Sequence, residues 1–274
     1  MANSKPRSST AKTNKIPVQG CPPVYTDQLY STASERLSNN CYSYSLALLQ
    51  HERGSKLQPG QLSGNSNAPV TCKALEPLVL RDGKQGGWIR SAEWGEKCPK
   101  GWYRICLLVS PGKKLNGGID NNSSFQDYHF VRQNGSVMYS LKSGETLSSV
   151  AKRFRVPRKN VQCLGRPHCI IKRSGTWSHK RGLASGALLE DATGKDLIFD
   201  PRAANWDFQD YNYNKTCCCF FVKRRETQVG AVLADKKLVR ERLEWARVHP
   251  DLRKTSSNNN KKSKSNQLNF TKKK

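Results

Sequence analysis

The chain has 274 residues, of which 47 are Lys or Arg and 21 are Asp or Glu, so its formal net charge is +26. This length is enough for one large domain or two small ones, although only 36% of the residues are hydrophobic. No stretch approaches the roughly 18 apolar residues of a membrane span, and residues 1–19 lack the apolar core of a secretory signal peptide. We therefore expect a chain without a membrane span or signal peptide, made in the cytoplasm.

The positive charge extends over the whole sequence. Residues 1–20 carry +4 and residues 251–274 carry +7, which leaves +15 for residues 21–250. Both ends lack the apolar residues of a core and are predicted to be a disordered basic arm and a disordered basic tail. A charge of this size predicts a polyanionic partner, either an anionic polymer or an acidic protein surface.

The first predicted element after the arm is a short helix that begins at Cys41. Asn39 or Asn40 is a suitable N-cap, because its side-chain amide can accept from the free backbone N–H groups of the first turn. The partial positive charge of a helix N-terminus stabilises a thiolate. Cys41 is therefore a candidate nucleophile, and residues 52–70, rich in Gly, Ser, Asn and Pro, are expected to form a loop.

Several alternating apolar segments separated by turn residues predict strands. They are residues 101–109, 125–133, 176–180, 197–201 and 216–222. His129 lies in the second of them and His179 in the third. One helix followed by this set of strands predicts the α+β class.

The ten cysteines are expected to be reduced thiols, because no signal peptide precedes them. Cys217, Cys218 and Cys219 are adjacent in an apolar segment, where packing is their expected role. A zinc site from Cys163, His168 and Cys169 with Cys98 or Cys106 is a weaker alternative, because no CxxC pair exists. We therefore expect no metal and no cofactor.

Residues 139–154 interrupt the series of strands. They predict a strand, a Ser-Gly turn and an amphipathic helix capped by Thr146, with its apolar residues at the i, i+3, i+4, i+7 spacing. A second amphipathic helix is predicted over residues 225–250. Its apolar stripe comprises Val232, Val239, Leu243 and Ala246, and its expected role is docking with a solvated basic face, with a partner-binding helix as the alternative.

The chain resembles the papain-like cysteine hydrolases of the NlpC type, and more closely an uncharacterised microbial family within them. The resemblance rests on four motifs in order: Asn-Cys-Tyr-x-Tyr from residue 40, Asp-Tyr-His-Phe-Val-Arg-Gln from 127, Gly-Thr-Trp-Ser-His-Lys from 175, and Asp-Pro from 200. It implies a papain-like core over residues 21–135 and 174–224, with a nucleophile helix packed on an antiparallel sheet.

The resemblance also implies a catalytic site. Cys41 would be the nucleophile and His129 the general base, with His179 or Asp200 as the group that orients the imidazole. Asn40 or the backbone N–H of Cys41 would stabilise an oxyanion. Asp127 shares a strand face with His129 and is expected only to hold the strand edge.

Residues 136–173 resemble a LysM module, because residues 139–154 match the family's opening pattern and the match fades after Val161. Such modules bind N-acetylglucosamine polymers, which implies that Gly144, Glu145, Thr146 and Leu147 contact a glycan. Removing the segment would join residues 132–135 to residues 174–177 as a hairpin, so the module is expected at a hairpin tip.

Two functions follow as hypotheses. The first is a cysteine amidase or peptidase that acts on cell-wall peptide or a glycan-linked amide and is anchored by the LysM-like module. The second is a non-catalytic structural protein, such as a minor capsid or packaging component of a large virus particle, which uses a hydrolase-derived fold and basic tails. In that case the protein would be virion-associated and would contact neighbouring capsid proteins.

Overall fold

The protein is described by a computed structural model. The described residues are 22–25, 30, 32–48, 56–65, 67–84, 86–115, 118–120, 126–165, 167–183, 185–194 and 197–224. They belong to one compact unit, Met1–Arg225, and Glu226–Lys274 form a second unit. The predicted basic arm, the predicted helix over residues 225–250 and the predicted tail lie outside the described residues.

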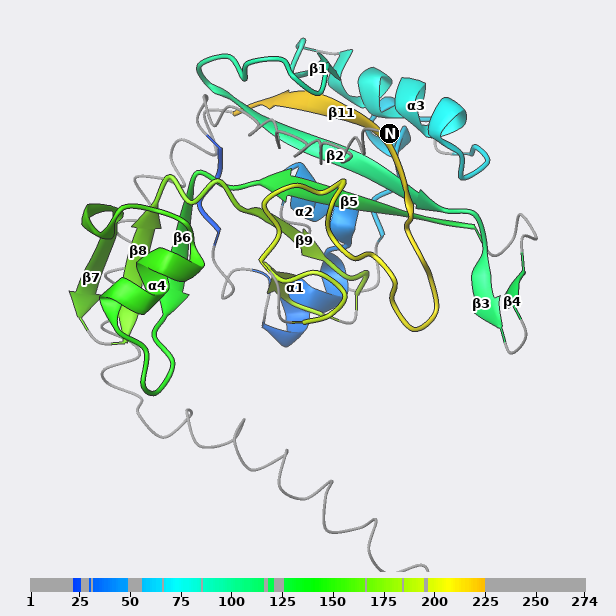
Figure 1. Cartoon of the computed structure of the whole chain (residues 1–274). Helices are drawn as coiled ribbons and strands as arrows, with labels where there is room; N and C mark the ends of the chain where they lie inside the picture. The colour runs from blue at the N-terminus through cyan, green and yellow to red at the C-terminus, as the bar shows by residue number, and fades with distance from the viewer. Residues whose placement is uncertain are drawn as a thin grey trace, which may run out of the picture. The chain divides into compact units, whose positions relative to one another are not determined.

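A six-stranded sheet in the order β1-β11-β2-β5-β9-β10 forms the centre of the fold, and every neighbouring pair in it is antiparallel. Its strands are β1 (Ile89–Ala92), β2 (Trp102–Ser110), β5 (Asp127–Gln133), β9 (Trp177–Lys180), β10 (Ala187–Leu188) and β11 (Lys215–Lys223). The two longest, β2 and β11, pair with each other inside the sheet (Figure 1). The α+β class is confirmed, while the papain-like topology stays a prediction.

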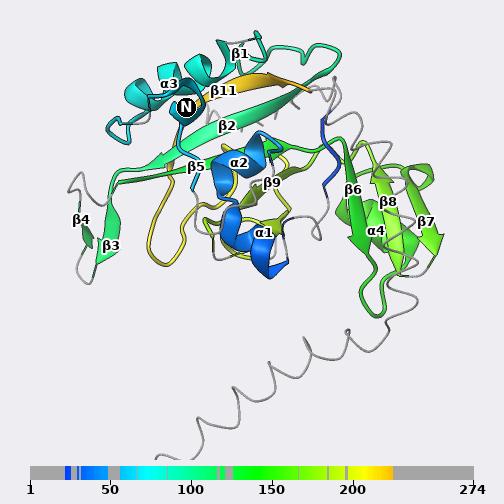
Figure 2. The same cartoon turned by 180° about the vertical axis from the view of Figure 1, so that it is seen from behind.

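The two faces of the sheet are covered differently (Figures 1 and 2). Helices α1 (Ala33–Ser38) and α2 (Cys41–Ser45) cover one face, and α3 (Cys72–Lys84) packs into the same core cluster as α2. We call this the helix face. The irregular segment between β10 and β11 covers the other face, which we call the loop face.

Strand alternation assigns side chains to these two cores, because successive residues of a strand point to opposite faces. In β2, Ile105 and Leu107 belong to the helix-face cluster with Tyr42, whereas Cys106 and Leu108 belong to the loop-face cluster with Trp206. The sheet is therefore buried on both sides, which explains the nearly continuous apolar sequence of β2.

Helix α3 is the main element that the sequence pattern does not predict. Pro77 lies inside it, where its missing N–H removes one helical hydrogen bond, and Gly83 near its end has low helix propensity. Burial of Leu75, Leu78 and Val79 on the helix face compensates for both. The predicted strand over residues 197–201 was wrong: only an isolated bridge, Leu197 to Glu190, is present there.

The segment 136–173 forms a strand, a helix and two further strands. These are β6 (Ser136–Ser140), α4 (Leu147–Arg153), the short 3-10 helix η3 (Arg158–Asn160), β7 (Val161–Gly165) and β8 (His168–Lys172), with the antiparallel sheet order β6-β8-β7. The chain leaves and re-enters the main sheet at one place, where Asn134 N donates to Thr176 O at 2.8 Å. The segment is therefore inserted in the chain between β5 and β9, at the tip of the hairpin that these two strands form.

The inserted segment shares its core with the rest of the unit. Val137, Val150 and Phe154 cluster with Tyr44 of α2 and Leu189 after β10. Tyr25 adds a parallel bridge to Val137. A LysM-like segment thus packs on its host instead of forming a separate core.

The expectation of reduced cysteines was wrong for six of them. The disulfides are Cys72–Cys217, Cys106–Cys219 and Cys163–Cys169. Two of these join residues directly opposite each other in antiparallel pairs, Cys106 with Cys219 and Cys163 with Cys169. The weaker zinc reading fails for the same reason, because Cys163, Cys169 and Cys106 have disulfide partners. Among the described residues, Cys41 and Cys218 are free thiols.

The remaining elements are peripheral. A 3-10 turn, η1 (Gln61–Ser63), precedes α3, and β3 (Lys113–Leu115) pairs with β4 (Gly118–Asp120). None of the helices in the described part of the chain has the length and apolar character that a membrane crossing requires.

Candidate functional site

Asn40 begins helix α2 as predicted, but its side chain is fully engaged. Its Oδ1 accepts from the backbone N–H of Ser43 at 3.0 Å, which satisfies one of the free donors of the first turn. Its Nδ2 donates to the carbonyl of Leu57 at 2.8 Å. Asn40 therefore caps the helix and ties it to the loop that follows α2, and its amide is not directed at an open site.

Cys41 is buried, with 5% of its surface exposed, in the cluster that contains Tyr128 and Phe130. Its Sγ lies 3.9 Å from the carbonyl oxygen of Tyr128. Burial raises the pKa of the Cys41 thiol to about 12, and the carboxylate of Asp127 adds to the rise. Helix α2 has only five residues, so its dipole is too small to offset the desolvation of a thiolate.

His129 and His179 are joined by a hydrogen bond of 2.9 Å between Nε2 of His129 and Nδ1 of His179. Nε2 of His179 lies 2.9 Å from the carbonyl oxygen of Glu190. Since a carbonyl only accepts, neutral His179 carries its proton on Nε2, and its Nδ1 accepts from Nε2–H of His129. His179 is thus placed to orient the His129 ring, while a catalytic role of the pair stays a prediction.

The two imidazoles lie in an aromatic surrounding on the loop face. The centroid of the His129 ring is 5.1 Å from that of Tyr213, 5.7 Å from Trp206 and 6.3 Å from Phe208. Burial lowers the pKa of His129 well below its usual value, and the neighbouring His179 lowers it further. Burial also lowers the pKa of His179 to about 4. Both rings are therefore neutral at neutral pH.

Strand β5 separates the thiol from the imidazole. Tyr128 and Phe130, which surround Cys41, point to the helix face, whereas His129 between them points to the loop face. No hydrogen bond joins the Cys41 sulfur to either histidine within the described residues. The predicted Cys41–His129 ion pair is not formed in this structure. Alternation along β5 directs His129 to the loop face, whereas Cys41 packs on the helix face.

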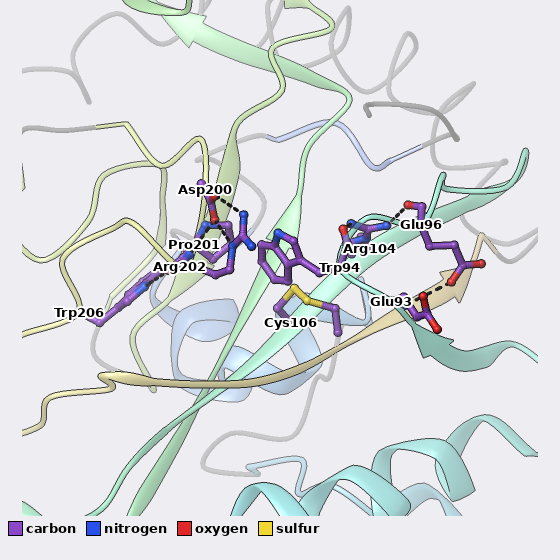
Figure 3. The surroundings of a disulfide bond; sticks show 10 residues. Glu93, Trp94, Glu96, Arg104, Cys106, Asp200, Pro201, Arg202 and Trp206 are labelled. Carbon is purple, nitrogen blue, oxygen red and sulfur yellow. Dashed lines mark hydrogen bonds and ion pairs between the residues drawn. A yellow bond between two sulfur atoms is a disulfide. The ribbon is translucent and has the colours of Figure 1, made fainter. Parts of the chain in front are cut away.

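Asp200 is not part of the histidine pair. Its carboxylate accepts from Nε of Arg202 at 3.1 Å and from NH2 at 2.8 Å. Figure 3 shows that the Arg202 guanidinium in turn lies against the ring of Trp94, beside the disulfide of Cys106, and the centroid distance is 4.1 Å. The structure therefore assigns Asp200 to a surface ion pair and leaves His179 as the partner of His129.

Asp127 has a structural role that agrees with its predicted place at the strand edge. Its Oδ2 accepts from the hydroxyl of Tyr213 at 2.6 Å, and its Oδ1 accepts from the backbone N–H of Tyr128 at 2.9 Å. Burial raises its pKa, and the Tyr213 hydrogen bond lowers it. These bonds fix the end of the segment that covers the loop face.

The predicted glycan-binding residues are used mainly within the inserted segment. Gly144 has a φ of +80° in the turn before α4, a conformation that favours glycine. The Glu145 carboxylate accepts from the hydroxyl of Tyr139 at 2.7 Å, and Thr146 forms a reciprocal capping box at the start of α4. Leu147 packs against the shared core. Glycan contact by these residues stays a prediction.

A buried polar network explains several motif residues that the catalytic reading leaves without a role. Arg132 donates to the hydroxyl of Tyr44 at 3.1 Å, and that hydroxyl lies 2.5 Å from Oγ of Ser178. Ser178 donates to Oδ1 of Asn134 at 2.7 Å, and Asn134 Nδ2 reaches Oγ1 of Thr176 at 3.4 Å. The network links α2 to the β5–β9 hairpin, so three of the four motifs meet in a structural feature.

Lys180 is a second buried group that the sequence reading does not single out. Its side chain crosses to the helix face and its Nζ donates to the carbonyl of Arg36 at 2.9 Å. Burial lowers its pKa to about 8. The only signal in the sequence is its position two residues after Ser178, on the same face of β9.

Comparison with known proteins gives limited information. No family model matches the chain, and no solved structure matches it. Over 108 residues the chain is 31% identical to insoluble matrix shell protein 1 of Ruditapes philippinarum. The match covers 39% of this chain and 57% of that protein, so the chain spans little more than half the length of the curated relative.

Proposed function

We propose that the protein is a non-catalytic structural protein that binds an acidic polymer through the basic surface of its inserted segment. The observation that carries this proposal is the unbalanced charge of residues 136–173, which contain nine Lys or Arg and one acidic residue. The papain-like likeness then describes the scaffold and not the activity, because a fold does not determine a function.

The basic residues of the inserted segment are available at its surface. Seven are exposed: Lys142, Lys152, Arg155, Arg158, Lys159, Lys172 and Arg173. Within the described residues, none of the seven forms an ion pair with an acidic side chain. Four of them fall within residues 152–159, from the last turn of α4 through η3. We call these four, Lys152, Arg155, Arg158 and Lys159, the basic cluster.

The one acidic residue of the segment does not neutralise this cluster. Glu145 lies 3.6 Å from Arg153, and Arg153 also pairs with Glu190 at 3.2 Å. Arg153 is therefore the cation that the nearby carboxylates balance, while the exposed cations around it keep their charge. Such a surface concentrates anions near it and speeds association with a polyanion.

The geometry around Cys41 argues against the cysteine amidase as the function of this chain. Its thiol is buried with a raised pKa, and the predicted base lies on the other face of β5. A thiol is a nucleophile only as the thiolate, which needs a lowered pKa or an adjacent base. Cys41 fits a packing role on the helix face better.

The disulfides and the curated relative support a structural role outside the reducing cytosol. Disulfides persist in oxidising surroundings such as the extracellular space. The relative with 31% identity is named as an insoluble matrix protein of shell, which is a structural setting. An acidic matrix polymer and the packaged nucleic acid of a virus particle are both polyanions, so the same surface would serve either setting.

A charge-reversal experiment tests this proposal. The variant K152E/R155E/R158E/K159E removes the basic cluster, and K73E/R81E/K84E/K97E makes the same change in charge at exposed positions outside residues 136–173. Binding of both full-length variants to heparin is measured over a series of salt concentrations. We expect salt-sensitive binding of the unaltered protein and a loss of about tenfold or more for the first variant alone.

Two results would count against the proposal. An equal loss in both variants would mean that binding follows net charge and not the basic cluster. Absence of salt-sensitive binding by the unaltered chain to heparin, and also to duplex DNA, would remove polyanion binding as the function.

A further inference from the structure

Strand β11 contains three consecutive cysteines, and an irregularity in the strand determines where each one points. Thr216 is opposite Leu108 and Cys218 is opposite Leu107, so Cys217 has no partner in β2. This two-against-one arrangement is a β-bulge. Cys219 follows in regular register opposite Cys106, to which it is bonded on the loop face.

The bulge places Cys217 and Cys218 on the same face of the sheet. Cys218 shares the helix face with its partner Leu107, and Cys217 is bonded there to Cys72, the first residue of α3. Cys72, Cys217 and Cys218 all pack against the helix-face core. A third sulfur therefore lies on the same side of the sheet as the Cys72–Cys217 disulfide, one residue along the chain from it.

The charge of a residue on α3 affects the Cys218 thiol. Glu76 lies one turn after Cys72, and residues four apart share one face of a helix. Burial raises the pKa of Cys218 to about 12, and the charge of Glu76 adds to the rise. Helix α3 packs against β11, and Cys72 and Cys218 pack against the same core cluster. Its thiol is half-buried and protonated at neutral pH.

We propose that Cys72, Cys217 and Cys218 form a thiol–disulfide exchange site with two interchangeable pairings, Cys72–Cys217 and Cys72–Cys218. Cys72 takes part in both pairings, and the two adjacent residues of the bulge alternate as its partner. Cys106 and Cys219 take no part, because they are bonded on the opposite face.

The exchange needs no oxidant or reductant. Cys218 gives up its proton, and its thiolate attacks Sγ of Cys72, so the Cys72–Cys218 bond forms as the Cys72–Cys217 bond breaks. Cys217 leaves as a thiolate and takes up a proton. One disulfide and one thiol are present before and after the step. A small external thiol can catalyse it by attacking Cys72 first and then being displaced by Cys218.

The presence of three consecutive cysteines in β11, where two would be enough for its disulfides, supports an exchange role. Cys217 is the extra residue of the bulge, and without it Cys218 and Cys219 would still face the two sides that carry Cys72 and Cys106. The two structural disulfides therefore need only two of the three cysteines. The extra residue Cys217 disrupts the ladder locally, and because it is bonded to Cys72, Cys218 remains as a free thiol next to a disulfide.

The test follows the free thiol in the full-length protein incubated with reduced glutathione at mildly alkaline pH. Free thiols are trapped with N-ethylmaleimide after increasing times, and fragment-ion spectra of the peptide of residues 216–223 locate the label. We expect label to move from Cys218 to Cys217 until both are occupied, with their sum unchanged. The Cys163–Cys169 pair serves as an internal control and should not gain label faster.

Two outcomes would overturn the proposal. One is label that stays on Cys218 at every time. The other is label that appears on Cys217 and Cys72 in equal amounts, which is simple reduction.

A pair of variants tests the two pairings of Cys72 without a time course. In Cys217→Ser we expect Cys72 to stay protected from alkylation, because it pairs with Cys218. In the matched control Cys218→Ser, Cys72 stays protected through Cys217. Labelling of both Cys72 and Cys218 in Cys217→Ser contradicts the proposal. If that variant does not fold, the redistribution of label in the unaltered protein still decides it.

Discussion

The imidazole of His129 donates from Nε2 to Nδ1 of His179, and His179 donates onward to the carbonyl of Glu190. This chain of two hydrogen bonds requires the His179 ring to be neutral, because a protonated His179 has no acceptor nitrogen. It also joins β5, β9 and the segment that covers the loop face. Protonation of the pair therefore acts on the cover of that face.

Stability should fall in mild acid because of this pair. The pKa of His179 is about 4 in the folded protein and about 6.5 in an unfolded chain, so between these values the unfolded state binds more protons. The contribution is present above about pH 6.5 and is lost as the pH falls towards 4, by about 3 kcal/mol. Urea unfolding at several pH values measures this. His179→Asn should flatten the slope, and an unchanged slope in that variant would show that other groups cause it.

Cys41 should react slowly with iodoacetamide at neutral pH. Its pKa of about 12 leaves almost no thiolate, and its side chain is buried. Because His129 lies on the other face of β5, His129→Ala should leave the rate of Cys41 labelling unchanged. Rapid labelling that depends on His129 would restore the cysteine hydrolase reading. The same reagent applied to urea-unfolded protein provides the reference rate.

Asp82 should be one of the most sensitive positions for stability. Its carboxylate is 4% exposed and accepts from Tyr42 OH at 2.8 Å, from Gly60 N at 2.7 Å and from Ser63 N at 2.9 Å. Asp82→Ala leaves these donors without a partner and should lower the free energy of unfolding by about 3 kcal/mol or more. Tyr42→Phe removes one of the three bonds and should cost about 1 kcal/mol. Equal losses in the two variants would contradict this account.

The disulfides should differ in their contribution to stability. Cys106 and Cys219 are 113 residues apart in sequence, whereas Cys163 and Cys169 are only 6 apart. Closing a longer loop removes more entropy from the unfolded chain, which predicts a loss of about 5 kcal/mol for C106A/C219A and about 2 kcal/mol for C163A/C169A. Denaturant unfolding under non-reducing conditions measures both. A larger loss for the short loop would show that loop closure is not the main contribution.

Local patterns in the sequence predict much of the fold. The strands that became β2, β5, β9 and β11 follow from apolar runs bounded by turns, and the caps Asn40 and Thr146 follow from residue type. These features depend on neighbours along the chain. Helix α3 is missed because Pro77 and Gly83 disfavour a helix, and burial of one face against β1, β2 and β11 stabilises it.

The candidate site was predicted less well, because it depends on long-range arrangement. The sequence places Cys41 on a helix and His129 on a strand, but it does not reveal which face of the sheet the helix covers. The Cys106–Cys219 disulfide depends on the register between two strands whose cysteines are 113 residues apart in sequence. Tyr44, Arg132 and Ser178 are conspicuous in the motifs, and only the structure shows that they bond to one another.

The bulge at Cys217 shifts the alternation of side chains along β11 by one residue. Residues on either side of it keep the faces that β2 requires, although the chain between them has one residue more than a regular ladder accommodates. A protein shortened by Cys217 alone should therefore keep its aromatic residues Phe220 and Phe221 on their present faces. Shortening it at Phe220 instead would reverse the faces of the residues on one side of the cut. Because removal of any one of the three consecutive cysteines gives the same sequence, tolerance to deletion in this strand should be confined to residues 217–219.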